Sequence, residues 1–247
     1  MKKLLSLFLV ALVCLSLLCG CEVEPPLTPA ETTAADVTVP VTEVQADYEE
    51  VYAETLDGVY DLISTDDELS FTAAGHTGVR EAIISLDKEQ ALEAVGYTFK
   101  DLTGDGFSEL IIGSVGSGEG VKAPIFAVYT IAHDMSFVIL EGMARSSYIL
   151  LDDGTFLYEG SGGAAYSGIG NYRMSQGGTS LICNEFYFTE PDDKDPGTLY
   201  IYKNTSGKWD KEKSEKTELT LDDFDKIRED FEAKIVSLEL TPFSQYK

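Results

Sequence analysis

The sequence predicts an α+β domain: a curved antiparallel β-meander, curled like a partial barrel, with helices near both ends of the chain. Apolar residues recur at helical spacing in residues 47–64 and again after Thr220. Between about residues 97 and 213 the apolar period changes to two, and turn residues separate the short runs. Short loops join consecutive strands as hairpins, and a sheet of about nine short strands curls.

Three segments are expected to be helices. The stripe in residues 47–64 consists of Tyr48, Val51, Tyr52, Leu56, Val59, Tyr60, Leu62 and Ile63. Asp87 with Gln90 resembles a capping box and predicts a short helix at 88–95. Thr220 caps the third helix, whose apolar stripe is Leu221, Phe224, Ile227, Phe231 and Ile235. We expect the N-terminal and C-terminal helices to pack on one face of the sheet. Ile83 and Ile84 are expected to point inward.

The strands follow from the alternating runs. They are expected at 109–114, 125–131, 135–143, 147–152, 155–161, 170–175, 180–189, 198–203 and 207–213. A last strand is expected at 236–240, where Val236, Leu238 and Leu240 alternate with polar residues and Pro242 limits the extension.

The N-terminal segment has the pattern of an export leader. Lys2 and Lys3 precede the apolar run Leu4–Cys19, which is short for a transmembrane helix. The run ends in Leu18-Cys19-Gly20-Cys21, which resembles the bacterial lipobox. The resemblance implies cleavage after Gly20, acylation of the Cys21 thiol with palmitate-type chains, and retention on the extracytoplasmic face of the cell membrane. A plain secreted protein and a short N-terminal anchor helix are the alternatives.

Three regions are therefore expected. Residues 1–20 are the signal peptide, residues 21–46 form a disordered Pro/Thr-rich tether, and residues 47–247 form a single α+β domain. The tether contains four prolines and almost no large apolar residue, so it cannot bury enough surface to offset its ordering entropy.

The charge of the chain restricts its partners. There are 43 acidic and 18 basic side chains, for a net charge of −25. This balance argues against nucleic-acid binding and against direct adsorption to anionic lipid. Contact with the lipid bilayer is therefore expected through acylated Cys21. After removal of the leader only Cys183 remains besides Cys21, so no intramolecular disulfide is expected, and Cys183 is interpreted as a small buried hydrophobe rather than a nucleophile.

One segment carries ligand chemistry. Oxygen side chains lie at positions 1, 3, 5 and 9 counted from Asp101, namely Asp101, Thr103, Asp105 and Glu109, and Phe107 would contribute its carbonyl. Gly106 stands where a calcium loop needs a sharp turn. The pattern is similar to the first half of an EF-hand loop, but position 12 is Ile112. It resembles more closely the strand-flanked calcium loops of FG-GAP propeller repeats. A Gly-rich turn in which aspartates cap backbone amides is the alternative.

The same segment carries a wider resemblance. Asp101–Gly113, Ile125–Thr130, Leu151–Thr155, Gly160–Gly163 and Leu240–Phe243 are similar to the corresponding pieces of a group of uncharacterised lipoproteins from Gram-positive bacteria. The resemblance implies an extracytoplasmic location and cation binding, and it brings no established activity.

Aromatic residues offer a second, weaker signal. Tyr158, Tyr166, Tyr172, Tyr187 and Trp209 could stack on sugars, but on alternating strands such residues are more often core or cross-strand pairs. The small residues of Gly160–Gly168 either form a binding lip or a bulged loop between strands.

Two function hypotheses follow. The first is a calcium-stabilised, membrane-anchored binding or interaction module that faces cell-wall glycan or a surface protein. The alternative is an extracytoplasmic hydrolase of cell-wall or polysaccharide substrates with acidic catalytic residues, which would require two carboxylates facing each other across a deep cleft.

Overall fold

The computed structural model describes residues 47–65, 75–116 and 122–247, which belong to one compact unit, Gln45–Lys247. The expected signal peptide, Cys21 and the tether lie outside the described residues. Within the described ranges, no helix combines the length and the apolar composition that a bilayer span requires.

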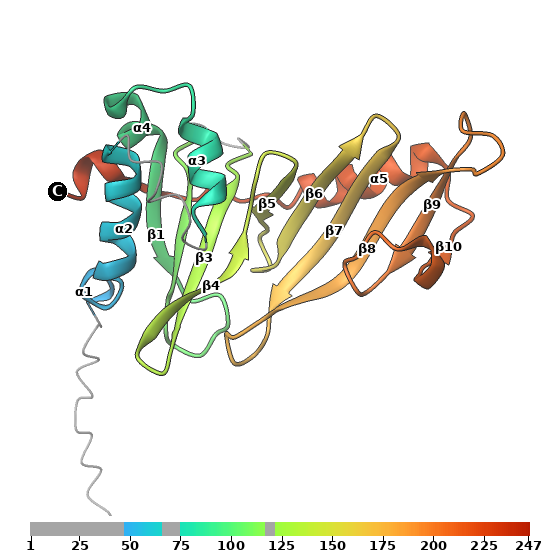
Figure 1. Cartoon of the computed structure of the whole chain (residues 1–247). Helices are drawn as coiled ribbons and strands as arrows, with labels where there is room; N and C mark the ends of the chain where they lie inside the picture. Colours follow the sequence, from blue (N-terminus) through green and yellow to red (C-terminus); the bar gives the residue numbers. More distant parts are fainter. Residues whose placement is uncertain (1–46, 66–74, 117–121) are drawn as a thin grey trace, which may run out of the picture. The chain divides into compact units, whose positions relative to one another are not determined.

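A single antiparallel sheet dominates the fold (Figure 1). Within the described residues its strands are β1 (Val95–Lys100), β2 (Glu109–Ser114), β3 (Ile125–Ala132), β4 (Met135–Glu141), β5 (Ser146–Leu150), β6 (Phe156–Gly163), β7 (Tyr166–Met174), β8 (Leu181–Pro191), β9 (Leu199–Asn204), β10 (Glu215–Lys216) and β11 (Thr241–Pro242). Their order is β10-β9-β8-β7-β6-β5-β3-β2-β1-β11, with β4 beside β3. Neighbours in sequence are mostly neighbours in the sheet, which confirms the predicted meander, and the sheet does not close.

Helices occupy the three predicted segments, with a break at Tyr52 in the first. They are α1 (Tyr48–Val51), α2 (Ala53–Ser64), α4 (Lys88–Ala94) and α5 (Leu221–Glu232), with 3-10 turns η2 (Lys211–Lys213) and η3 (Phe243–Gln245). A further helix, α3 (Thr77–Ile83), was not predicted. Asp87 and Gln90 form the predicted capping box at the start of α4. Thr220 and Asp223 form another at the start of α5. Each box satisfies two backbone N–H groups that the first helical turn leaves without partners.

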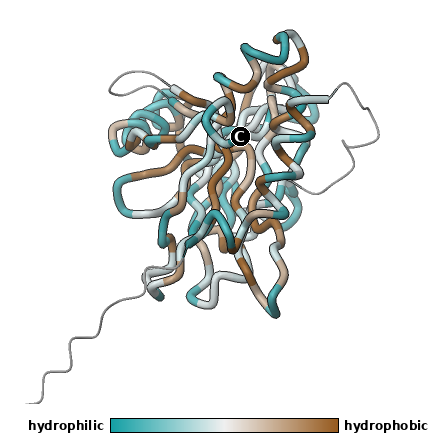
Figure 2. Tube along the Cα trace, turned by 90° about the vertical axis from the view of Figure 1, so that its left-hand side faces the viewer, coloured by the Kyte–Doolittle hydropathy of each residue, from teal (hydrophilic) through white to brown (hydrophobic). Residues whose placement is uncertain are grey.

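The helices near both ends of the chain pack on the same face of the pleated sheet, as expected. In β2 and β3, Ile112 and Ala127 pack with α2, whereas the alternate residues Ile111 and Val128 join the cluster of Tyr158 on the other face, and α5 also packs opposite that cluster. Figure 1 shows α3 over the strands at one end of the sheet and α5 along the strands at the other end, and Figure 2, seen from the side of α2, shows hydrophobic stretches along the strands. Leu56, Val59 and Leu62 of α2 join a core with β1–β3, whereas Phe224 and Phe231 of α5 pack on β5–β9. Because each buried phenylalanine contributes about 1.5–3 kcal/mol, α5 holds its side of the sheet firmly.

Alternation along β5–β9 gives these strands two different faces. Leu157 and Tyr187 pack in the cluster under α5. Their neighbours Tyr158, Phe186 and Phe188 pack on the opposite face, in a cluster of aliphatic and aromatic residues to which none of the described helices contributes. This second face carries the hollow described below.

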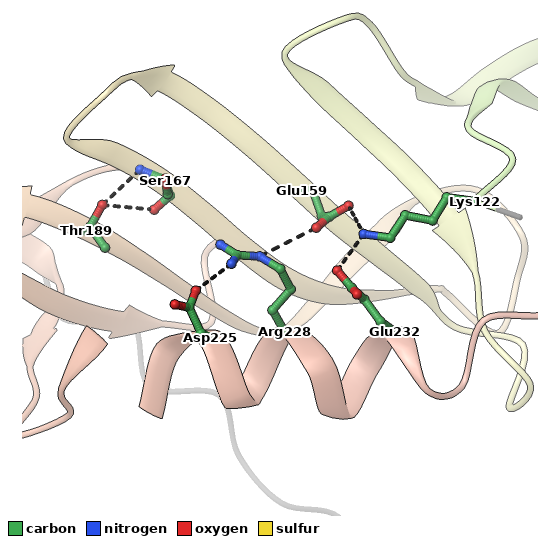
Figure 3. A network of polar contacts seen from close by, with 7 residues as sticks. All are labelled: Lys122, Glu159, Ser167, Thr189, Asp225, Arg228 and Glu232. Atoms are coloured by element: carbon green, nitrogen blue, oxygen red, sulfur yellow. Dashed lines mark hydrogen bonds and ion pairs between the residues drawn. The ribbon is translucent and has the colours of Figure 1, made fainter. Parts of the chain in front are cut away.

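Charged contacts fix the position of α5. Figure 3 shows Glu159 of β6 pointing toward the helix, between Lys122 and Arg228. A Glu159 oxygen lies 3.4 Å from Lys122 Nζ, and the other lies 3.6 Å from Arg228 Nε. Lys122 also pairs with Glu232, and Arg228 with Asp225. Partly exposed pairs of this kind contribute roughly 0–1 kcal/mol each, so their main effect is to orient the helix.

Two predicted strands and one predicted core residue were wrong. Residues 207–213 form a loop and η2, because the Asn204 side chain accepts hydrogen bonds from Ser206 and Gly207 and donates to the Lys208 carbonyl. Residues 236–240 form no strand, since the edge of β1 pairs with Thr241 and Pro242 instead. Ile84 is 81% exposed, because α3 turns its other side to the core.

Candidate metal centre

The predicted calcium loop joins β1 to β2. These strands pair antiparallel, with Lys100 opposite Glu109 across the base of the loop. The loop is therefore flanked by strands, as in the strand version of a calcium loop rather than in the helix-flanked EF-hand. Gly104 and Gly106 have φ values of +78° and +88°, in the left-handed region that favours glycine. The sharp turn that was expected at Gly106 is confirmed.

Asp101 organises the first half of the loop. Its Oδ1 accepts hydrogen bonds from the N–H groups of Thr103 (3.2 Å) and Gly104 (2.7 Å). Its Oδ2 accepts from the Gly106 N–H at 2.8 Å. Desolvation acts to raise the pKa of Asp101, but the hydrogen bonds from Gly106, Gly104 and Thr103 outweigh it and lower the pKa. The carboxylate is therefore held charged at the mouth of the loop.

Asp105 and Thr103 also form hydrogen bonds within the loop. Asp105 Oδ1 accepts from the Phe107 N–H at 2.8 Å. Thr103 Oγ1 lies 3.4 Å from Asp101 Oδ1, within the same turn. The alternative interpretation, in which aspartates cap backbone amides, therefore describes part of what the structure contains.

Glu109 differs from the two aspartates because it is buried. Glu109 is only 1% exposed, and its Oε2 accepts a hydrogen bond from the Leu102 N–H at 2.9 Å. Burial raises the pKa of Glu109, the Leu102 hydrogen bond opposes this, and the charges of Asp105 and Asp101 raise the pKa further. In the part of the chain that the structure describes, no Lys or Arg forms an ion pair with this carboxylate.

Two distant segments enclose Glu109. Tyr52 lies between α1 and α2, where burial and then the nearby Glu109 carboxylate raise the pKa of Tyr52, and its hydroxyl donates to the Ser108 carbonyl at 3.1 Å. Gly178, in the turn between β7 and β8, lies over the carboxylate: a Cβ added there would be 3.5 Å from Glu109 Oε1 and 3.4 Å from Thr130 Oγ1. The sequence contained no local signal for either contact, because both partners are far from Glu109 along the chain.

Aromatic contacts anchor the second half of the loop to α1. The Phe107 ring meets the Tyr48 ring edge-on, with 5.3 Å between centroids. The Ser108 N–H donates to the Tyr48 hydroxyl at 3.1 Å. Phe107 was predicted only as a carbonyl ligand, and the structure gives its side chain this second role. The loop is thus preorganised by packing as well as by hydrogen bonds.

The residues fit a hard cation in their chemistry. All the candidate side-chain ligands are oxygens, and the buried Glu109 lies near two further carboxylates that raise its pKa. They do not converge, however: within the described ranges, no three His, Cys, Asp or Glu side chains are grouped as metal ligands. A bound cation would therefore compete with the backbone N–H groups for the aspartate oxygens.

A hollow of about 450 Å³ adjoins this loop, and Asp101, Asp152 and Asp153 are among the residues that line it. The Asp153 pKa is raised by desolvation but lowered overall by hydrogen bonds from Thr155, and the Asp101 pKa is also lowered. A glycosidase acid needs a raised pKa. Glu109, whose pKa is raised, does not line this hollow. Asp101 and Asp153 therefore do not form the acid and base pair that the hydrolase hypothesis requires.

Cys183 is half-buried and lies close to Tyr172. Burial raises the pKa of the Cys183 thiol, and this outweighs the opposing hydrogen bonds from Tyr172 and Gly207. A nucleophilic cysteine needs a lowered pKa, so the structure favours the interpretation of Cys183 as a packing residue.

Comparisons with known proteins add no assignment. Neither the family models, nor the curated proteins, nor the solved structures that we searched contain a match to this chain.

Proposed function

We propose that this protein is a lipid-anchored binding module on the extracytoplasmic face of a bacterial membrane, stabilised by calcium in the Asp101–Glu109 loop. The proposal has two parts, an anchor and a cation site, and each rests on its own observation. The anchor rests on the leader and on the position of Cys21 after Leu18-Cys19-Gly20. The resemblance to Gram-positive lipoproteins supports the same location.

The observation that carries the cation site is the buried carboxylate of Glu109. Burying a charge without an oppositely charged partner is costly, and Asp101 and Asp105 add to the cost because they are negative as well. A divalent cation bound to these oxygens would relieve both. Asp101, Thr103, Asp105, the Phe107 carbonyl and Glu109 would hold it. The carboxylates of Asp101 and Asp105 would have to turn from backbone N–H groups toward the ion.

A thermal unfolding experiment tests the cation site. Calcium that binds only the native state at one hundred times its Kd should raise the free energy of unfolding by about 2.7 kcal/mol. For a domain of this size that corresponds to a rise in Tm of roughly 5–10 °C. Magnesium at the same concentration is the control for ionic strength, and we expect a smaller rise with it because Mg²⁺ demands a stricter geometry. An unchanged Tm at millimolar calcium would contradict this part.

Mass spectrometry tests the anchor. The protein isolated from bacterial membranes should begin at Cys21 and carry acyl chains on that residue. The Cys21→Ala variant should keep its leader or appear unacylated in the medium. An unmodified amino terminus at another residue in the wild-type protein would contradict the anchor, and it would leave the cation site untouched.

A further inference from the structure

A second concave site lies on the face of the sheet opposite α5. It is a hollow of about 390 Å³ at the end of the β6–β7 hairpin, and we name it the aromatic hollow. Arg145, Tyr158, Ser161, Tyr166, Glu190 and Trp209 are among the residues that line it. Its volume falls in the range of small-ligand sites, and it lies apart from the calcium loop.

Trp209 forms one wall of the aromatic hollow. Its ring packs against Phe186 and Phe188, with centroid distances of 5.6 Å to each. Gly168 makes room for it, because a Cβ at that position would come within 2.4 Å of Trp209 Cζ2. The residue is nevertheless 38% exposed. The indole is therefore held in one orientation and still offers surface to a ligand, which lowers the entropy cost of binding.

Tyr166 forms a second wall at the start of β7, and it is also 38% exposed. The backbone on either side of it is fixed by Thr189, whose Oγ1 accepts from the Ser167 N–H at 2.9 Å and donates to the Ala165 carbonyl at 2.8 Å. Figure 3 shows the Ser167–Thr189 contacts. Because the hairpin backbone is fixed, the exposed Tyr166 ring is already in position to contact a ligand.

The other aromatic candidates have structural roles. Tyr158, Tyr172 and Tyr187 are each less than 9% exposed, and Tyr187 packs on the α5 side of the sheet. The core interpretation is therefore correct for these three. The glycines of the Gly160–Gly168 run make room for rings, since a Cβ at Gly160 would clash with the Tyr158 hydroxyl. The hairpin also contains the expected bulge, between Ser161 and Gly163.

The polar groups of the aromatic hollow have opposite charges. Arg145 and Glu190 line it together, and neither forms an ion pair with another side chain in the ranges that the structure describes. Ser161, which is exposed, adds a hydroxyl. A ligand that suits this set must both donate to a carboxylate and accept from a guanidinium, while its apolar side contacts two aromatic rings.

We infer that the aromatic hollow binds a neutral saccharide. Sugar hydroxyls both donate and accept hydrogen bonds, and the C–H face of a pyranose ring covers an aromatic ring. A proline-rich peptide fits less well, because its backbone offers mainly carbonyl acceptors and would leave Glu190 unpaired. An anionic polymer is disfavoured because the chain has a net charge of −25. This inference rests on the proposed binding function and gives that function a ligand class.

Trp209 is the single tryptophan of the chain, so its fluorescence reports on the aromatic hollow alone. We would titrate the full-length protein, in a detergent without a sugar headgroup, with N-acetylglucosamine tetrasaccharide, cellotetraose and maltotetraose. At least one should change the Trp209 emission in a saturable way, with matching heat in calorimetry. If none of them binds, the inference is wrong. It is equally wrong if a proline-rich peptide produces the change and no saccharide does.

Variants distinguish stacking from a general effect on the fold. Tyr166→Ala should weaken saccharide binding about tenfold, whereas Tyr166→Phe should retain it. Leu221→Ala is the matched control: this residue is 47% exposed but lies on α5, on the other side of the sheet, and its loss should leave binding unchanged. Arg145→Gln supplies a second test in case Tyr166→Ala lowers the Tm. Full binding by both Tyr166→Ala and Arg145→Gln would overturn the site. The calcium-dependent rise in Tm should persist in all four variants, so failure here is separable from failure of the cation site.

Discussion

Two acidic turns border the same hollow, and they differ in what lies beneath their carboxylates. Asp101 opens the β1–β2 loop, and its side chain accepts from the Gly104 N–H at 2.7 Å. Asp153 opens the turn before β6, and its side chain accepts from the Thr155 N–H at 2.9 Å. Only the first turn is followed by a buried carboxylate, Glu109. A capping aspartate by itself only stabilises a turn. When a buried carboxylate follows the turn, as Glu109 does here, the turn becomes a candidate cation site.

The largest expected effect tests whether this difference decides calcium binding. Asp101→Ala should abolish the calcium-dependent rise in stability, about 2.7 kcal/mol at one hundred times Kd, because the loop loses its first ligand. Asp153→Ala should cost about 1 kcal/mol as a lost cap, yet keep the whole calcium-dependent rise. Differential scanning calorimetry with calcium and with chelator measures both. Equal calcium-dependent rises in the two variants would show that the buried carboxylate does not decide which turn binds calcium.

The next effect concerns Glu109 itself. Without calcium, Glu109→Gln should stabilise the protein at neutral pH by roughly 1–3 kcal/mol, because it removes a buried charge and keeps an acceptor for the Leu102 N–H. The same variant should lose the calcium response. Glu215→Gln, an exposed position on β10, is the control and should change neither property.

The pH dependence of stability in the wild-type protein and in Glu109→Gln tests the burial of this carboxylate further. The pKa of Glu109 is raised above its ordinary 4.5, so the native state binds this proton more tightly than the unfolded state does. Stability should therefore fall as the pH rises from about 4.5 toward the pKa in the folded state. The Glu109→Gln variant should lack this component in urea unfolding across that range. An identical pH profile for wild type and variant would contradict the assigned burial.

The smallest expected effect concerns the backbone, where the two turns should behave alike. Gly106 and Gly154 have φ values of +88° and +79°, and a Cβ at either would meet nothing within 4 Å. Alanine should therefore cost about 1–2 kcal/mol at each position through conformation alone. Gly177→Ala, where φ is not positive, should be nearly neutral. Midpoints of chemical denaturation measure these costs. A clearly larger cost at Gly106 than at Gly154 would show that the turns differ in backbone as well.

Errors in the sequence-based prediction cluster where distant residues compete for the same edge or core. Residues 236–240 alternate as a strand should, and Val236 and Leu238 do pack in the core. They nevertheless form no ladder, because the edge of β1 is occupied by Thr241 and Pro242. Similarly, the segment around Trp209 reads as a strand, yet its aromatic ring docks on Phe186 and Phe188 from a loop.

The sequence by itself determined the features that depend on residues a few positions apart. These are the capping boxes at Asp87 and Thr220, the order of the hairpins, and the turn of the Asp101–Glu109 loop around Gly106. Local hydrogen bonds and backbone sterics act over such distances whatever surrounds them.

Only the tertiary structure decided which polar and aromatic groups are buried. Glu109 and Asp105 have the same chemistry in the loop pattern, but Tyr52, between α1 and α2, and the Gly178 turn enclose Glu109 alone. Tyr158 and Tyr166 both carry aromatic rings near one hairpin, yet only Tyr166 remains exposed. Burial depends on segments far away along the chain, and periodicity within one segment carries no information about them.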